Sequence, residues 1–411
     1  MNPVYVKGET KNNSKLKLWL QSLGPGIITA ALVFGPSKIT IATKIGAEYS
    51  FDLLWVVVVA IFFMVIFTSM AARIGIATDQ SLLNTIKQKW GNRIGIAIGF
   101  GVFLVSASFQ AGNSIGVGIA LAELTHTVRV PWIIFFNLVG IGLLFLRSFY
   151  KVLEKIMLSL ISLMLLAFVT TFFISKPPVT KIAEGLVPQM PAGSLILVTA
   201  FIASCFSIVA AFYQAYLIQE RKRLQPAGSI IKDRSFTGIF ILGLLGAIVL
   251  ICSAVVLHPQ GIKVTNATDM AKALEPLFGN YASLLFLCGL FGASFSALVG
   301  NSTLGGTILG DALGYGSKLT SKAVRLLIAI VMIVGAIIAI VFGKLPIQLI
   351  VFAQFITITI VPFIGIAMYV IANDKKIMSN HVNSAIQKIL GATGLLLVIV
   401  LALESVRTML F

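Results

Sequence analysis

Long apolar segments, separated by short polar ones, run along almost the whole chain. An apolar stretch of about 20 residues is long enough to cross a bilayer as a helix. The pattern predicts an all-α integral membrane protein with eleven transmembrane helices. Their expected ranges are 24–46, 51–75, 94–121, 131–149, 152–175, 194–219, 235–257, 281–310, 323–343, 346–372 and 387–410.

The composition agrees with a membrane protein. Of the 411 residues, 58% are hydrophobic and only 11% are charged, with a mean hydropathy of +1.01, whereas soluble domains carry about 25% charged residues. The net charge of +17 is of the kind that nucleic-acid-binding proteins carry. Here the basic residues lie between the apolar segments, so the sequence predicts no nucleic-acid partner. Cys205, Cys252 and Cys288 all fall inside apolar segments, which predicts no disulfide framework.

The distribution of basic residues predicts the orientation. If the tail 1–20 is cytoplasmic, the cytoplasmic segments hold 22 of the 31 Lys and Arg residues, and the outer segments hold eight. Cytoplasmic loops of membrane proteins are enriched in Lys and Arg. We therefore expect a multi-pass protein of the inner or plasma membrane, with its N-terminus in the cytoplasm and its C-terminus outside. The remaining basic residue, Lys38, lies inside the first predicted helix.

The first predicted helix is interrupted by Gly35-Pro36-Ser37-Lys38. Proline kinks or breaks helices, and we expect Ser37 to cap a second half-helix that restarts at Ile39. A charged residue within a membrane helix costs about 2.5–3.5 kcal/mol on insertion scales and faces a cavity or a partner. Because a helix start also favours anions, Lys38 is predicted to pair with an anionic substrate. Two alternatives remain: a tethered cation beside an uncharged or zwitterionic substrate, and a side chain that snorkels to the surface.

Several stretches resemble one known family in sequence and in order. They are "GPGIITA" with "IGAEYSFDLLW", then "AARIGIATDQSL", "LFLCGLFGASFSALVGNSTLGGTILGD" and "LIVFAQFITITIVPFIGIAMYVIANDKKIMSN". They are similar to helices 1, 2, 8 and 10 of Nramp-type divalent-metal transporters. The resemblance implies one domain over 1–411 with a LeuT-type fold. Its inverted five-helix repeats (helices 1–5 and 6–10) would cover 24–175 and 194–372, followed by an extra helix over 387–410. It also implies that helices 1 and 6 are unwound, with the substrate between them.

The chain departs from the family where the family binds its metal. The Asp and Asn ligands of the family's helix 1 correspond to Gly35 and Lys38. The Met-Pro-His of its helix 6 corresponds to Ser207, Ile208 and Val209. The chain is therefore identified as a divergent relative that lacks the metal-binding motifs, and no metal site is predicted.

Two further helices of the family contribute to its transport pathway. An acidic pair on helix 3, associated with protons, corresponds to Gln110 and Asn113, and the family's helix 10 glutamine is kept as Gln354. In helix 6 of this chain, polar residues could face a pocket or pack. The residues predicted to bind substrate are Gly35, Pro36, Ser37, Lys38, Ser204, Ser207, Tyr213, Gln214 and Gln354, and the predicted polar pathway is Lys38, Gln110 and Asn113.

The predicted substrate follows from the charges. All fourteen acidic residues fall in loops or near the ends of the apolar segments, whereas divalent cations prefer sites with negatively charged ligands. The first hypothesis is a secondary transporter of a small organic anion or amino-acid-like carboxylate, with a proton as candidate co-substrate and no cofactor. The alternatives are a divalent-metal (Mn, Fe or Mg) transporter with a rebuilt site and a non-transporting membrane sensor. No constellation of acid, base and nucleophile indicates an enzyme.

Overall fold

The computed structural model describes residues 35–224, 235–343 and 346–410, and within these ranges all regular structure is helical. The predictions for the tail 1–20 and for residues 24–34 lie outside the described residues. The long helices are α2 (Pro36–Tyr49), α3 (Leu54–Ala77), α5 (Asn92–Thr125), α6 (Arg129–Leu143), α7 (Arg147–Ser175), α9 (Leu195–Cys205), α10 (Ile208–Leu224), α11 (Ser235–Val256), α14 (Ala282–Ala312), α15 (Lys322–Phe342), α16 (Pro346–Ala372) and α18 (Ala385–Leu410).

Within the described residues, each predicted apolar segment overlaps one of these helices or a pair of them, and the segment 24–46 does so through its second half, α2. Nine segments of the described chain are long and apolar enough to cross a membrane, and the pair α9 and α10 counts as one of them. α6 is apolar but has only 15 residues. The structure thus supports a multi-pass helical membrane protein with nine clear spans in its described part.

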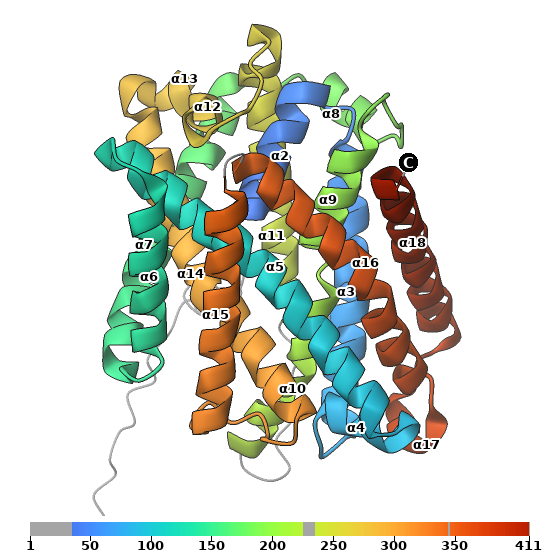
Figure 1. Ribbon diagram of the computed structural model, residues 1–411. Helices are drawn as coiled ribbons and strands as arrows, with labels where there is room; N and C mark the ends of the chain where they lie inside the picture. The colour runs from blue at the N-terminus through green and yellow to red at the C-terminus, as the bar shows by residue number, and fades with distance from the viewer. Residues whose placement is uncertain (1–34, 225–234, 344–345, 411) are drawn as a thin grey trace, which may run out of the picture.

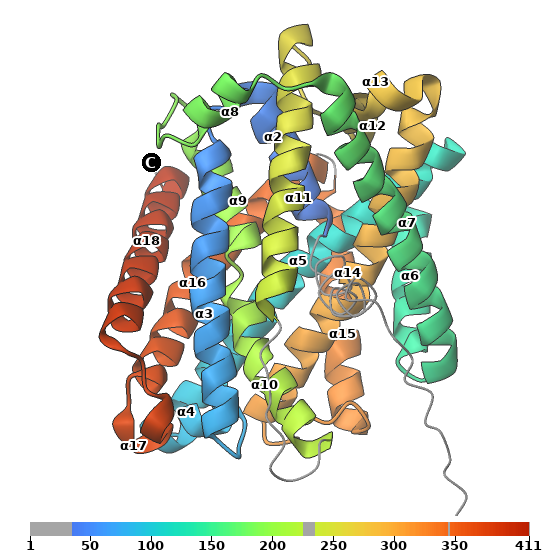
Figure 2. The same cartoon turned by 180° about the vertical axis from the view of Figure 1, so that it is seen from behind.

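The long helices run between two ends of the molecule, and short helices lie at both ends (Figure 1). One end carries α8 (Val179–Gly185), α12 (Ala267–Ala271) and α13 (Glu275–Phe278). The opposite end carries α4 (Leu82–Trp90) and α17 (Lys375–Met378). α5 and α16 tilt strongly across the bundle on the face seen in Figure 1. The opposite face is formed by α3, α10 and α11 (Figure 2).

α5 and α14 form the most extensive helix–helix contact of the described chain. Their interface is built from small residues. A Cβ added to Gly305 of α14 would lie 2.5 Å from Cβ of Ser106, and one added to Gly116 of α5 would lie 2.3 Å from Oγ of Ser294. Lipid tails are as apolar as leucine, so close packing rather than hydrophobic burial drives helices together in a membrane. This close approach fixes α5 against α14 and gives the site described below a rigid wall.

Arg73 of α3 joins three parts of the chain near the end that carries α17. Its Nη1 donates to Oε1 of Gln387 at 2.8 Å, and its Nη2 donates to Oδ1 of Asn383 at 2.7 Å. Asn383 in turn donates from Nδ2 to Oδ1 of Asn373, just beyond α16, at 2.8 Å. Arg73 therefore fastens α18 and the end of α16 to α3.

Replacing Arg73 tests this fastening. Arg73→Ala removes the two hydrogen bonds that reach Gln387 and Asn383, each worth about 1.5–3 kcal/mol, together with a longer one to the carbonyl of Ser69 in the same helix. It leaves the amide oxygens of Asn383 and Gln387 without that donor. We expect a clearly lower melting temperature for the purified protein. Arg93→Ala is the matched control, because Arg93 is exposed on the first turn of α5. Equal melting temperatures for the two variants would contradict the assigned role.

Candidate functional site

α2 begins inside the predicted first helix, at the interruption seen in the sequence. Gly35 is the N-cap residue, with extended backbone angles (φ −75°, ψ 174°), and Pro36 occupies the first turn. Proline suits this position because its missing N–H has no helical partner there. The expectation that Ser37 caps a helix restarting at Ile39 is wrong. The helix starts three residues earlier without a side-chain cap, because the fixed φ of Pro36 already fits the first helical turn.

The sixth predicted helix is also broken, as the resemblance implied. α9 ends at Cys205, and Phe206 leaves the helical conformation (φ −83°, ψ 68°). Ser207 then accepts a hydrogen bond at Oγ from the backbone N–H of Ala210 at 3.2 Å, which is the usual N-cap interaction of serine. The break therefore needs neither proline nor glycine, because a serine cap restarts the chain as α10.

A cavity of about 460 Å³, here called the central cavity, adjoins both breaks. Its lining comes from α2, α3, α5, α9, α10, α11 and α14 and includes most of the residues predicted from the sequence. The predicted residues that line it are Gly35, Ser37, Lys38, Asn113, Ser204, Ser207, Tyr213 and Gln214.

Lys38 is the only cationic residue among the described residues that line the central cavity. Its exposed fraction is 7%, and it lies in the first turn of α2. This burial argues against the alternative in which the ammonium snorkels to the surface. The described lining contains no Asp or Glu, and no cluster of three or more His, Cys, Asp or Glu residues suited to a metal occurs in the described ranges.

The lining also contains two buried polar groups that have no hydrogen-bond partner within the described structure: Nδ2 of Asn113 and Oγ1 of Thr68. Buried polar groups are nearly always satisfied by protein, water or ligand. Together with Ser37 and Lys38, they provide donors on three different helices, α2, α3 and α5. The arrangement is suited to a solute that carries hydrogen-bond acceptors.

Three predicted site residues do not line the central cavity: Pro36, Gln110 and Gln354. Gln110 is fully buried, and its Nε2 lies 3.5 Å from Oδ1 of Asn137 on α6. Asn137 also donates to Ser114 at 3.0 Å, so α5 and α6 share a neutral polar network. Gln354 is fully buried, and neither its amide oxygen nor its nitrogen has a partner in the described structure. Roles for these three in transport remain predictions.

Several lining residues escaped the sequence analysis. α3 contributes Met64 and Thr68, and α11 contributes Ile239 and Leu242. Both helices are so uniformly apolar that periodicity reveals no cavity-facing side, although Thr68 was a weak signal. Asn301 of α14 also lines the cavity, whereas the small residues around it favoured a packing role.

Beyond Tyr213 the central cavity approaches a smaller, more polar one of about 420 Å³. Tyr213 and Leu217 line both. The ring of Tyr213 stacks on that of Tyr216, with centroids 6.0 Å apart. The Tyr216 hydroxyl donates to Oδ2 of Asp311 on α14 at 2.6 Å. Tyr213 therefore lies where the two cavities meet, and its stacking partner Tyr216 is hydrogen-bonded to α14.

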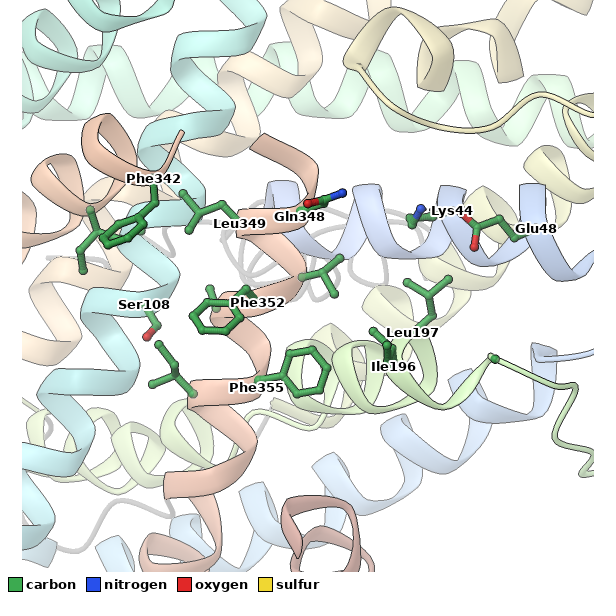
Figure 3. Close-up of a pocket in the computed structure, with 16 residues that line it drawn as sticks. Lys44, Glu48, Ser108, Ile196, Leu197, Phe342, Gln348, Leu349, Phe352 and Phe355 are labelled. Carbon is green, nitrogen blue, oxygen red and sulfur yellow. Dashed lines mark hydrogen bonds and ion pairs between the residues drawn. The ribbon is translucent and has the colours of Figure 1, made fainter. Parts of the chain in front are cut away.

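A larger cavity of about 740 Å³ is lined by residues of α2, α5, α9, α15 and α16 (Figure 3). Its walls are mainly apolar, with Phe352 and Phe355 prominent. Lys44 and Glu48 lie together at one side and form an ion pair of 2.5 Å. We select the smaller central cavity as the candidate site, because it adjoins both helix breaks and the buried Lys38.

The sequence and the fold of this chain are similar to those of known proteins. The sequence profile described as "Natural resistance-associated macrophage protein-like" (Nramp) matches residues 26–408. The chain is 23% identical over 394 residues to a divalent metal cation transporter MntH of Caldanaerobacter subterraneus subsp. tengcongensis, covering 92% of this chain and 90% of that one. It is also 23% identical to the MntH of Deinococcus radiodurans, covering 94% of this chain and 89% of that one.

Solved structures show the same fold. A manganese transporter of Eremococcus coleocola, crystallised with an aromatic bis-isothiourea substituted compound, aligns with a TM-score of 0.69 at 18% identity, over 98% of this chain and 89% of that one. Mhp1, a nucleobase-cation-symport-1 family transporter in a closed conformation, aligns with a TM-score of 0.55 at 14% identity, over 93% of this chain and 92% of that one. The chain therefore belongs to the Nramp family of membrane transporters and has the LeuT-type fold.

Proposed function

We propose that this protein is a secondary active transporter that carries a small organic anion or amino-acid-like carboxylate through the central cavity. The observation that carries the proposal is the placement of Lys38. It lines the cavity at the start of α2, in a described lining without Asp or Glu. A helix start and an ammonium group both attract negative charge, and half-helix starts hold substrate carboxylates in transporters with broken helices.

Electrostatics oppose a bare divalent cation at the same place. Two unit charges about 4 Å apart interact by about 4 kcal/mol at an effective dielectric constant of 20. For a divalent cation beside the Lys38 ammonium, this interaction is repulsive and roughly twice as large. Hydroxyls and amides such as those of Ser37 and Asn113 are neutral oxygen ligands, so the lining supplies no negative side chain to offset the repulsion.

The size of the central cavity also supports an organic substrate. Sites for small molecules usually measure about 300–1,000 Å³ and combine apolar walls with a few polar groups. At about 460 Å³, the cavity falls within that range. It combines polar residues such as Ser37 and Asn113 with apolar ones such as Met64 and Leu242.

Divalent-metal transport is the second candidate, and the names of the relatives favour it over an organic anion. The MntH proteins are named divalent metal cation transporters, and the Eremococcus coleocola protein is named a manganese transporter. A metal carried by this chain would have to remain hydrated and bind through neutral oxygens, whereas hydrated Mg²⁺ in proteins is usually held by one or two carboxylates or by substrate phosphates. The identities of 23% or less leave room for a changed substrate.

The transport cycle proposed here uses the two breaks. α2 and the α9–α10 pair rock around the central cavity, so that the site opens alternately to the two sides. The protonated Lys38 binds the anion on one side of the membrane, and both the anion and the proton are released on the other side, which couples the two movements. The proposal includes eleven spans in a single domain 1–411, with repeats over 24–175 and 194–372 and an extra helix over 387–410. It places the N-terminus in the cytoplasm and the C-terminus outside the plasma membrane.

Uptake by Lys38 variants tests the anion proposal. In proteoliposomes, we expect Lys38→Met to lower saturable uptake of radiolabelled monocarboxylates at least tenfold, because a hydrogen bond to a charged group is worth about 1.5–3 kcal/mol. Lys38→Arg keeps the charge and should retain part of the uptake. Lys322→Met is the control, since Lys322 is exposed at the start of α15 and lines neither cavity. Wild-type uptake by Lys38→Met would refute the proposal.

Metal binding separates the two candidates. In calorimetric titrations with Mn²⁺ and Mg²⁺, we expect no saturable heat for the wild-type protein, because Lys38 repels the ion and the lining lacks a carboxylate. We expect Lys38→Asp, which places an acidic ligand at this position, to gain Mn²⁺ binding. Saturable Mn²⁺ binding to the wild type that disappears in Asn113→Ala would instead establish the metal reading.

A further inference from the structure

The helices that line the central cavity contribute different chemistry: α3 and α11 contribute mainly apolar residues, whereas the other helices contribute both polar and apolar ones. The polar residues Ser37, Lys38 and Asn113 belong to α2 and α5, and further polar residues come from α10 and α14. By contrast, α3 and α11 contribute Met64, Ile239 and Leu242, with Thr68 and Gly238 beside them. We call Met64, Ile239 and Leu242 the apolar wall. A solute made of charge and hydrogen-bonding groups alone would leave this wall without a partner.

A close crossing of α3 and α11 fixes the apolar wall in place. A Cβ added to Gly243 of α11 would lie 2.4 Å from Cγ1 of Ile61 on α3, so the two helices touch at this point. Leu242 is the neighbour of Gly243 in the chain, and Met64 follows Ile61 by about one turn. The exposed fractions of Met64, Ile239 and Leu242 are only 5%, 6% and 3%. The wall is therefore held by packing and offers a preformed apolar surface.

The cavity is also elongated. It reaches from Ser207, beside the α9–α10 break, to Leu217 on α10. At a rise of 1.5 Å per residue, the nine steps between the ten residues Ile208 to Leu217 span about 13.5 Å. A single ion or a two-carbon acid occupies only a fraction of this length. The shape fits a solute with its charged group at the break and an apolar body that extends along the wall.

We infer that the apolar wall of α3 and α11 binds the apolar body of the substrate, and that the substrate is a monocarboxylic acid with several carbon atoms. This inference rests on the proposed function, in which Lys38 binds the carboxylate. Met64, Ile239 and Leu242 are then specificity-determining residues. They select for apolar length, whereas Lys38 selects for charge. The inference predicts that affinity rises with each methylene group buried against the wall.

A series of straight-chain acids measures this dependence. Purified full-length protein is titrated with acetate, butyrate and hexanoate, and dissociation constants are obtained by calorimetry or thermal shift. We expect affinity to rise about fourfold per added methylene, which corresponds to the transfer free energy of a buried CH₂ group. We expect Lys38→Met to weaken binding of all three acids by a similar factor. This series requires no variant of the wall, so a failure of a wall variant to fold would not remove the test.

Variants of the apolar wall then test whether this rise in affinity with chain length arises at Ile239 and Leu242. Leu242→Ala and Ile239→Thr should reduce the gain from butyrate to hexanoate and leave acetate binding nearly unchanged. The matched control is Leu244→Ala, because Leu244 lies on the same helix, is 52% exposed and does not line the central cavity. Melting temperatures without ligand show which variants are folded.

Three outcomes would overturn the inference. If the acids bind with equal affinity whatever their length, and binding still needs Lys38, the apolar wall has no such role and the proposed function stands. If hexanoate binds Lys38→Met as tightly as wild type, the binding is non-specific partition into apolar surface, and both ideas fail. If no acid binds and Mn²⁺ does, the proposed function fails and the inference with it.

Discussion

A helix that stops in the middle of a membrane leaves backbone N–H and C=O groups without water to satisfy them. Such ends are tolerated only where they are buried in protein or line a polar cavity. The rest of this structure depends on that constraint. α2 begins at Pro36, and α9 ends at Cys205, so the chain must supply a cavity with polar partners beside both breaks. Ser207 accepts a hydrogen bond from one free backbone N–H as an N-cap. The other unpaired backbone groups at the breaks lie next to the central cavity.

The same constraint explains why one side chain can change what the site selects. In water, the charge of a lysine is screened and counts for little. At a helix start within a buried cavity, the effective dielectric constant is lower, and each charge acts at several kcal/mol. The Lys38 ammonium adds to the positive end of α2 instead of opposing it. Under the proposed function, the family fold is kept while the charge of the preferred substrate is inverted.

Much of the fold was predictable from the sequence, because long apolar segments leave few structural options. The interruption at Gly35-Pro36 was also predictable, because proline breaks or ends a helix. The second break was harder to predict, because its only local signal is the N-cap serine Ser207. Its existence followed from the family resemblance and not from propensity. The expected cap at Ser37 was wrong, because the first turn accepts proline without strain.

The site was predictable only in part, and the reason is physical. Eight of the predicted residues line the central cavity, because polar residues in an apolar helix have few places to lie. The apolar wall could not be predicted, because Met64 and Leu242 look like every other apolar residue of α3 and α11. Only the lining of the central cavity in the structure shows which sides of these helices face inward. The central claim is direct contact between the Lys38 ammonium and a substrate carboxylate. Magic-angle-spinning NMR measures it as the dipolar coupling between ¹⁵N in lysine and ¹³C in the carboxyl group of bound butyrate. The account predicts a coupling that corresponds to about 4 Å or less, the range of an ion pair, and its loss in Lys38→Met. Bound butyrate without any such coupling in the wild type would contradict it.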